Sequence, residues 1–331
     1  MNVQNPIDWP RLAKLIHAHR RFTLTSHVKP DCDALGSEVG LAAVLESLGK
    51  QVAIVNADPV PPHLRFIDPE QRIKQLGIDI SAESAVDCDA LIVADTSAWI
   101  QLGAMGDVLR KTRGTRLVLD HHVSEDDLGA EYFKNPQAEA TGRLVVELAD
   151  ELDVSLTPRI AAPLFTAIAT DTGWFRFSSV TGDTFRTIGR LIDACAKPAV
   201  IYNALYERHT LARVQLMGRI LARTTSELEG RLIHTVALQQ DFVETGALPG
   251  DTEDLVNTTL AVAGTQVAVF FSEQPNGSFK VSFRSRCEVD CAKVAEQFGG
   301  GGHRAAAGAT VTGDWPIVRA KVLDGVRAAM T

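Results

Sequence analysis

The chain has 331 residues, of which 45% are hydrophobic and 22% charged, and its formal net charge is −8. This length favours two domains, and the composition is typical of a folded globular protein and not of a disordered chain. Lys and Arg are scattered along the sequence without forming a basic stripe, so a partner with only a few phosphates fits better than a long nucleic acid duplex. The five cysteines include no CxxC pair, which argues against a disulfide framework and against a structural zinc knuckle.

The chain carries no recognisable targeting or membrane segment. Its first residues lack a basic stretch followed by an apolar run, and no later segment approaches about 18 continuous apolar residues. We therefore expect a cytoplasmic protein with no membrane partner, in a compartment that keeps its cysteines reduced.

In the first half of the chain, short apolar runs alternate with amphipathic stretches of helical length. Strands are predicted at residues 22–26, 51–55, 90–94 and 115–119, and helices at 34–48, 140–152 and 158–170. This alternation predicts an α/β fold with a mostly parallel sheet flanked by helices. The next stretch is nearly all helical, with helices at 183–194 and 199–223 and a break at Lys197-Pro198.

The pattern of the second half is different. Strands are predicted at 231–238, 266–272 and 278–284, and Pro275-Asn276-Gly277 forms a hairpin turn between the last two. A helix at 291–298 and a C-terminal helix from Pro316 complete a smaller α/β domain. The predicted domains are therefore a catalytic domain at 1–192, a helical linker at 193–225 and a second domain at 226–331.

The strongest local signal is a strand-to-helix loop that carries His27, Asp31 and Asp33. In extended geometry the two aspartates face opposite ways, so they could serve two different metal ions. The alternative is that they only cap the following helix, as Asp often does in this position.

Three more signals lie at the ends of predicted elements. Asp95 follows one apolar strand, Asp120-His121-His122 follows the next, and Asp171 ends a helix. Each pattern is common by itself, but residues just past the carboxyl ends of parallel strands meet in one crevice. Together these side chains supply enough carboxylates and imidazoles to hold two metal ions.

With these motifs in place, the sequence resembles the DHH phosphoesterases, whose name is the triplet at Asp120-His121-His122. The segments HVKPDCDALGS, VADTS and ATDTGWFRFS match the other family motifs in order. In the second half, FRSR and FGGGGHRAAAG are similar to the DHH-associated domain that binds substrate. The resemblance covers nearly the whole chain.

The resemblance implies an active site with two divalent metal ions. The implied metal ligands are His27, Asp31, Asp33, Asp95, His121 and Asp171, with Asp95 bridging the two ions. His122 would face the substrate phosphate. Asp120 would act as an anchor behind the site and would not itself bind a metal ion. Carboxylate and imidazole ligands without cysteine suit Mn²⁺ best, with Mg²⁺ and Zn²⁺ as alternatives.

The glycine-rich segment has its own interpretation. Four glycines permit positive φ and the close approach of backbone N–H groups to a phosphate, although such a run by itself is more often a flexible turn. The implied substrate-binding residues are Arg284, Ser285, Gly299, Gly300, Gly301, Gly302, His303 and Arg304. For Trp174 and Phe175, stacking on a base and burial between domains both stay open.

Among DHH proteins, the sequence resembles the oligoribonucleases that degrade very short RNA (nanoRNA) to 5′-mononucleotides and also dephosphorylate 3′-phosphoadenosine 5′-phosphate (pAp). An alternative within the family is a phosphodiesterase for cyclic di-AMP or pApA. The alternative from another class is a catalytically idle nucleotide-binding protein. The expected partners are short RNA oligonucleotides or small phosphorylated nucleotides, and a homodimer is left open.

Overall fold

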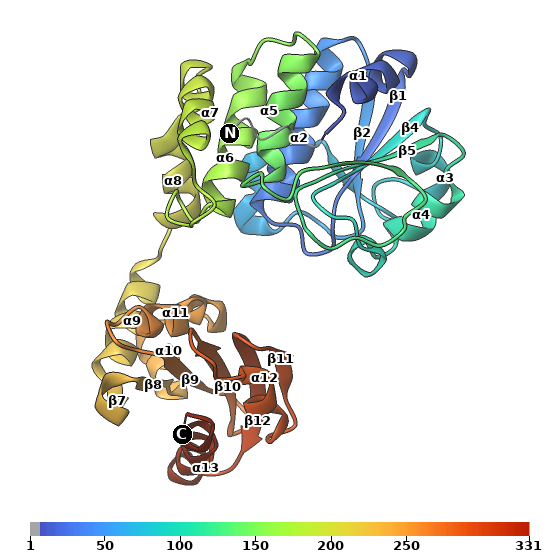
Figure 1. Ribbon diagram of the computed structural model, residues 1–331. Helices are drawn as coiled ribbons and strands as arrows, with labels where there is room; N and C mark the ends of the chain where they lie inside the picture. Colours follow the sequence, from blue (N-terminus) through green and yellow to red (C-terminus); the bar gives the residue numbers. More distant parts are fainter. Residues whose placement is uncertain (1–6, 331) are drawn as a thin grey trace. The chain divides into compact units, whose positions relative to one another are not determined.

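The computed structural model describes residues 7–330 and divides the chain into two compact units, Met1–Arg208 and His209–Thr331 (Figure 1). Residues 1–6 and 331, at the outer ends of the two predicted domains, lie outside the described part. Each unit has a six-stranded sheet and hydrophobic clusters of its own. In the described part of the chain, no helix is both long and apolar enough to cross a membrane.

The sheet of the first unit has the strand order β3-β2-β1-β4-β5-β6, and all of its neighbours are parallel. The predicted parallel sheet is confirmed, with β3 and β6 as two short edge strands that the sequence patterns did not predict. The bounds are β1 Arg21–Thr25, β2 Gln51–Asn56, β3 Ile73–Gln75, β4 Ala90–Ala94, β5 Thr115–Asp120 and β6 Glu131–Lys134.

Helices cover both faces of this sheet (Figure 1). In β4, Ala90 and Ile92 join the cluster under α1, α2, α5 and α6, while Leu91 and Val93 join the cluster under α3 and α4. Such a strand reads as a continuous apolar run because successive side chains point to opposite, equally buried faces. The bounds are α1 Trp9–Ala18, α2 Cys32–Ser47, α3 Ala82–Ala85, α4 Met105–Lys111, α5 Thr141–Glu151, α6 Pro158–Asp171, α7 Gly182–Asp193 and α8 Pro198–Tyr206, with 3₁₀ helices η1 Pro62–Ile67 and η2 Trp99–Leu102.

The predicted linker at 193–225 is divided between the two units. Helix α8 contributes Ile201 to the main cluster of the first unit, whereas α9 contributes Leu216 to a cluster of the second. The single helix expected at 199–223 is wrong, because the chain leaves helical geometry after Tyr206 and starts again when the Thr210 side chain caps α9 by accepting from the Arg213 N–H at 3.0 Å. The break expected at Pro198 is confirmed, since this proline begins α8.

The second unit has a mixed sheet with the order β11-β12-β10-β9-β8-β7, in which only the β8–β9 pair is parallel. The predicted hairpin is confirmed, with Gly277 at φ 76°. The strands are β7 Thr225–Glu227, β8 Leu232–Ala237, β9 Val267–Glu273, β10 Ser278–Ser285, β11 Gly301–His303 and β12 Ala306–Thr312. The helices are α9 Leu211–Ala222, α10 Gln239–Thr245, α11 Leu255–Leu260, α12 Cys291–Glu296 and α13 Trp315–Ala329, with 3₁₀ helices η3 Leu228–Gly230 and η4 Pro249–Thr252.

Close packing of α2 against α6 depends on a glycine. A Cβ on Gly36 would lie 2.4 Å from the carbonyl oxygen of Pro163, well inside van der Waals contact. The two helices can therefore approach only because this position has no side chain. Asp33, one turn earlier on α2, and Asp171, at the end of α6, are brought to the same edge of the sheet by this packing.

We expect Gly36→Ala to lower the free energy of unfolding by about 1–3 kcal/mol, because the added methyl group overpacks the α2–α6 contact. The matched control is Gly189→Ala in α7, where a Cβ would meet nothing within 4 Å. This variant should raise the free energy of unfolding by about 0.4–1 kcal/mol. Urea denaturation of the two variants measures the difference. Equal effects at the two positions would contradict the packing argument.

Candidate metal centre

Strand ends and helix ends bring the six predicted metal ligands to one edge of the first sheet. His27 follows β1, Asp95 follows β4 and His121 follows β5, and these three strands are neighbours in the sheet. The strand order reverses between β1 and β4, where open α/β sheets form their ligand crevice.

One group of side chains consists of His27, Asp31 and Asp95. The Nε2 atom of His27 lies 3.8 Å from Oδ1 of Asp31 and 3.6 Å from Oδ2 of Asp95. These separations are too long for hydrogen bonds. They suit two donors that each lie about 2.1 Å from one shared ion.

A second group consists of Asp33, His121 and Asp171. The Nε2 atom of His121 lies 3.8 Å from Oδ2 of Asp33 and 3.6 Å from Oδ2 of Asp171. The same nitrogen lies 3.6 Å from Oδ1 of Asp95. Asp95 therefore presents one oxygen to His27 and the other to His121, as a carboxylate that bridges two ions would.

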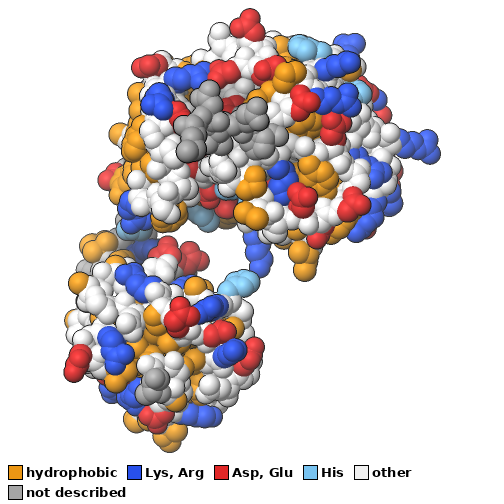
Figure 2. Space-filling model, in the orientation of Figure 1, with side chains coloured by type: hydrophobic (Ala, Val, Ile, Leu, Met, Phe, Trp, Pro, Cys, Tyr) orange, Lys and Arg blue, Asp and Glu red, His pale blue; other side chains and the backbone are white. Residues whose placement is uncertain are grey.

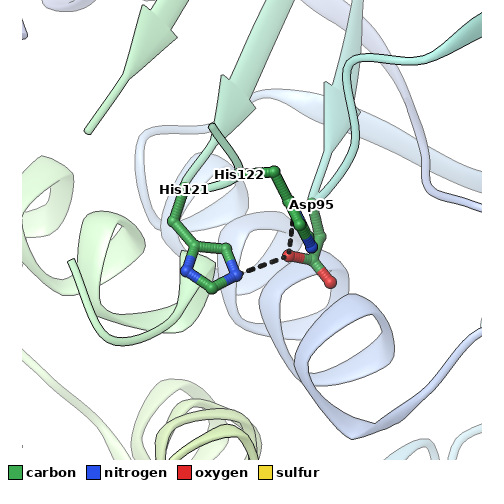
Figure 3. Close-up of side chains that lie close together, drawn as sticks. All are labelled: Asp95, His121 and His122. Atoms are coloured by element: carbon green, nitrogen blue, oxygen red, sulfur yellow. Dashed lines mark ion pairs between the residues drawn. The ribbon is translucent and has the colours of Figure 1, made fainter. Parts of the chain in front are cut away.

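Figure 3 shows the contact between His121 and Asp95, and it also shows His122 directed at the same oxygen of Asp95. His122 is the less suitable ligand, because its Nδ1 already lies 2.8 Å from Oδ1 of Asp120. Asp120 also accepts the backbone N–H of His122 at 3.0 Å and is fully buried. His122 is thus held by Asp120, and its Nε2 is left for another partner.

The two histidines proposed as ligands have the orientation that metal binding requires. His27 Nδ1 lies 2.9 Å from the carbonyl oxygen of Val28, and His121 Nδ1 lies 3.1 Å from that of Ala138. A carbonyl can only accept, so each Nδ1 donates to a carbonyl oxygen, and each Nε2 is the ring nitrogen directed at the carboxylates.

At the carboxylates of the site, burial and mutual repulsion outweigh the effect of the nearby histidines. Burial and the nearby Asp33 and Asp31 raise the pKa of Asp95 well above its usual value, and burial also raises that of Asp33. Burial and Asp33 raise the pKa of Asp171 to about 6. The residues therefore fit divalent cations, which would neutralise this charge, and they do not form a balanced network of protein groups alone.

The loop at Asp31 and Asp33 differs from the extended geometry that we expected. Asp31 is the N-cap of α2, where its Oδ1 accepts from the N–H groups of Asp33 and Ala34, each at 3.0 Å. Asp33 lies inside the first helical turn. The helix-capping interpretation is thus correct for Asp31, yet the two carboxylates still belong to different groups because the helix turn, and not strand alternation, separates them.

Sequence reasoning did not find Thr141, the first residue of α5. Its N–H donates to Oδ2 of Asp33 at 2.7 Å, and its hydroxyl donates to Oδ1 of Asp95 at 2.8 Å. Gly142 donates its N–H to Oδ1 of Asp33 at 2.9 Å. The start of α5 therefore orients two proposed ligands, and a threonine before an apolar helix gave no signal of this contact.

In the second unit, strand register places some of the predicted substrate residues on one face of the sheet. His303 pairs with Ala306, and Ala306 pairs with Arg284, so these side chains point to the same side. In the next row, Gly301 pairs with Gly308, which pairs with Ser282. This face therefore carries small residues, with the side chains of Arg284 and His303 beside them.

This face continues into a cavity of about 470 Å³ lined by Lys280, Ser282 and Arg284 of β10 and by the segment that includes Glu253. Lys280 is exposed and shares the face with Arg284 because both are even-numbered positions of the same strand. Sequence analysis missed Lys280, although strand alternation from Arg284 could have found it.

Other predicted substrate residues do not share this face. Ser285 is buried on the opposite side, and its hydroxyl accepts from the N–H of Cys287 at 3.2 Å. Arg304 is exposed and paired with Glu288. Gly300 and Gly302 serve packing, because a Cβ on either would lie within 3 Å of the β12 backbone, whereas a Cβ on Gly301 would meet nothing within 4 Å.

Trp174 and Phe175 are half-buried against the core of the first unit, where both rings contact Phe165. Trp174 also contacts Tyr202 and Tyr206 of α8 edge-on. These contacts give the two aromatic residues a packing role within the first unit.

Basic residues form no continuous stripe on the visible surface. Figure 2 shows Lys and Arg side chains interspersed with acidic ones on the visible face of both units. This distribution agrees with the net charge of −8 and does not suit a long phosphate backbone.

Comparison with protein families places known domains on both units. A model described as the DHH family, N-terminal domain, matches residues 21–168, and one described as the DHHA1 domain matches residues 232–330. The chain is 34% identical to the bifunctional oligoribonuclease and PAP phosphatase NrnA of Thermus thermophilus, over 100% of this chain and 98% of that protein. It is 28% identical to the protein of the same name from Bacillus subtilis, over 91% and 92% of the two chains.

More distant relatives include the cyclic-di-AMP phosphodiesterase PdeA of Listeria monocytogenes, 25% identical over 88% of this chain but only 45% of that protein. Among solved structures, an exopolyphosphatase-related protein from Bacteroides fragilis has the same fold, with a TM-score of 0.81, 24% identity, and coverage of 97% and 94%.

We expect Asp171→Asn to stabilise the metal-free protein at pH 7.5 and to have no such effect near pH 3.5. The pKa of Asp171 is about 6 in the folded chain against a usual 3.8, so ionisation opposes folding only above that usual value. Denaturation in the presence of a chelator, at both pH values, measures this. A stabilisation of the same size at both pH values would contradict the charge-repulsion argument.

Proposed function

Because this chain belongs to the DHH family, we propose that it is a phosphoesterase that hydrolyses very short RNA to 5′-mononucleotides and dephosphorylates pAp. The observation that carries the proposal is the position of Asp95, whose two oxygens face two separate groups of proposed metal ligands. The Thermus thermophilus and Bacillus subtilis proteins named bifunctional oligoribonuclease and PAP phosphatase NrnA match at least nine-tenths of the chain, which supports this choice of substrates.

In this proposal each group of side chains holds one ion. His27, Asp31 and Asp95 would hold the first ion, and Asp33, Asp95, His121 and Asp171 the second. Four of the six proposed ligands are carboxylates, the other two are imidazoles, and no cysteine takes part. Mn²⁺ is therefore the proposed metal, with Mg²⁺ and Zn²⁺ as alternatives. When bound, such a pair of ions lowers the pKa of a coordinated water and neutralises charge on the attacking and leaving oxygens.

The protein itself would position the phosphate and bind the rest of the substrate. Asp120 holds Nδ1 of His122, so Nε2 can donate to a phosphate oxygen. The hydrogen bond to Asp120 also raises the pKa of His122, which favours the protonated, donating imidazole.

The sheet face that carries Gly301, Arg284 and His303 suits the capture of a small nucleotide. Gly301 has no internal packing reason to lack a side chain, so its open backbone can approach a phosphate. Arg284 and His303 flank it on the same face, where they can form charge-assisted hydrogen bonds to phosphate oxygens. We retain Ser285, Gly299, Gly300, Gly302 and Arg304 as proposed contributors through the backbone or the shape of this segment.

The other candidate functions have less support. The cyclic-di-AMP phosphodiesterases are more distant and about twice as long as the region they share with this chain. A catalytically idle protein would not need to keep six metal-binding side chains within reach of one another. The substrate proposal therefore stays with nanoRNA and pAp.

With Mn²⁺ present, we expect the protein to release 5′-mononucleotides from RNA of two to five residues and to convert pAp to AMP. Asp95→Ala should abolish both reactions and weaken Mn²⁺ binding, because it removes a ligand of both ions. Asp107→Ala, at an exposed position of α4 in the same unit, is the control. Turnover of Asp95→Ala at the parental rate would refute the two-metal mechanism.

We expect His303→Ala to raise KM for pAp by about 10-fold or more, since it removes a charge-assisted hydrogen bond, while Mn²⁺ affinity stays unchanged. His63→Ala, an exposed histidine of η1, is the matched control. Steady-state kinetics and metal titration measure the two effects. A KM equal to that of the parent would remove His303 from the substrate site.

A further inference from the structure

A buried lysine lies behind the DHH triplet. Lys134, the last residue of β6, is the direct register partner of Asp120 at the end of β5, and its side chain is only 8% exposed. Lysine is seldom buried unless it is paired. The partners of this lysine therefore indicate what it does.

Lys134 reaches Asp120 both directly and through Ser97. Its Nζ lies 2.7 Å from the Ser97 hydroxyl and 3.4 Å from Oδ2 of Asp120. It also donates to the carbonyl oxygen of Ser124 at 3.0 Å. Glu125 lies 3.2 Å away, but that side chain is 57% exposed, so water weakens this pair.

The direction of the hydrogen bonds follows from the donor inventory. An ammonium group can only donate, so the Ser97 hydroxyl accepts from Lys134 and keeps its single proton for another acceptor. The nearest acceptor is Oδ2 of Asp120, at 2.7 Å. A chain of contacts thus runs from Lys134 through Ser97 to Oδ2 of Asp120.

The other oxygen of Asp120 completes the chain. Oδ1 accepts both the backbone N–H and Nδ1 of His122, at 3.0 and 2.8 Å. Donors on both oxygens fix the plane of this carboxylate, and the carboxylate plane fixes the imidazole ring. If Lys134 were removed, the Ser97 hydroxyl could turn to the Ser124 carbonyl, 2.9 Å away, and Oδ2 would lose its donors.

We propose that Lys134 is a positioning residue for hydrolysis: through Ser97 and Asp120 it holds the His122 ring with Nδ1 toward Asp120 and Nε2 free for the substrate phosphate. The inference rests on the proposed function, because it takes His122 as the group that meets the phosphate. The Lys134 ammonium contacts Ser97, Asp120, Ser124 and Glu125, and none of these is one of the six proposed metal ligands.

Lys134→Met tests the proposal, with Lys134→Arg as the conservative variant and Lys74→Met as control. Lys74 is an exposed lysine of β3 bonded to the Gln71 carbonyl oxygen. We expect kcat on a dinucleotide RNA to fall by about 10–100-fold in Lys134→Met, with KM and Mn²⁺ affinity within about threefold of the parent. Lys134→Arg should recover most of the rate, and Lys74→Met should match the parent.

A double-mutant cycle with His122→Ala separates positioning from a merely structural role. If Lys134 acts through His122, Lys134→Met should cause no further loss of turnover in the His122→Ala background. In metal-free protein with ¹⁵N-labelled histidine, the Nδ1 resonance of His122, assigned from its absence in His122→Ala, should shift in Lys134→Met but not in Lys74→Met.

Each unfavourable outcome has a distinct meaning. Parental kcat in Lys134→Met, or the same fractional loss with and without His122, overturns the role of Lys134 and leaves the proposed function intact. Parental turnover of His122→Ala instead refutes the proposed role of His122, and the Lys134 inference with it. If Lys134→Met does not fold, Ser97→Ala interrupts the same chain of contacts, and the same losses are expected of it.

Discussion

Mutual repulsion among buried carboxylates is the constraint on which the first unit depends. Asp33 and Asp95 are almost fully buried, and their neighbours include Asp31, Asp120 and Asp171. Removing such charges from water is costly unless cations or hydrogen-bond donors replace the solvent. The fold supplies backbone N–H groups from the starts of α2 and α5, and the proposed pair of metal ions supplies the missing positive charge.

Asp120 has a different environment from the other acids of this cluster. It receives donors on both oxygens from protein groups, with a lysine nearby. Although burial opposes the effect, the hydrogen bonds from His122 lower the pKa of Asp120, whereas the pKa of Asp95 is raised. Environment alone thus separates an acid suited to orienting a histidine from acids suited to holding metal.

In the proposed function, the two units would have different roles because their surfaces differ in chemistry. The first unit gathers acids and imidazoles at the carboxyl edge of a parallel sheet, where strand ends converge. The second unit presents glycine, alanine and serine on an open sheet face beside Arg284, Lys280 and His303. Small residues there would leave room for the proposed ligand, and a few basic side chains would match a ligand with few phosphates.

The amino-acid sequence by itself determined the parallel sheet, the six converging ligand candidates and the class of chemistry. These depend on local patterns: apolar strands that stop at Asp or His, and motifs whose order is fixed along the chain. A parallel sheet necessarily brings such strand ends together, so no tertiary detail was needed to place His27, Asp95 and His121 near one another.

Only the tertiary structure decided which atoms meet. Asp31 caps a helix and still lies in a group of proposed metal ligands. Thr141 hydrogen-bonds two other proposed ligands, 46 and 108 residues away in the sequence. Lys134 reaches Asp120 through strand register. Within the glycine run, the pairing of β11 with β12 assigned Gly300 and Gly302 to packing and left Gly301 open. The physical reason is that each contact joins segments distant in sequence, and the local pattern of neither segment records which partner it will face.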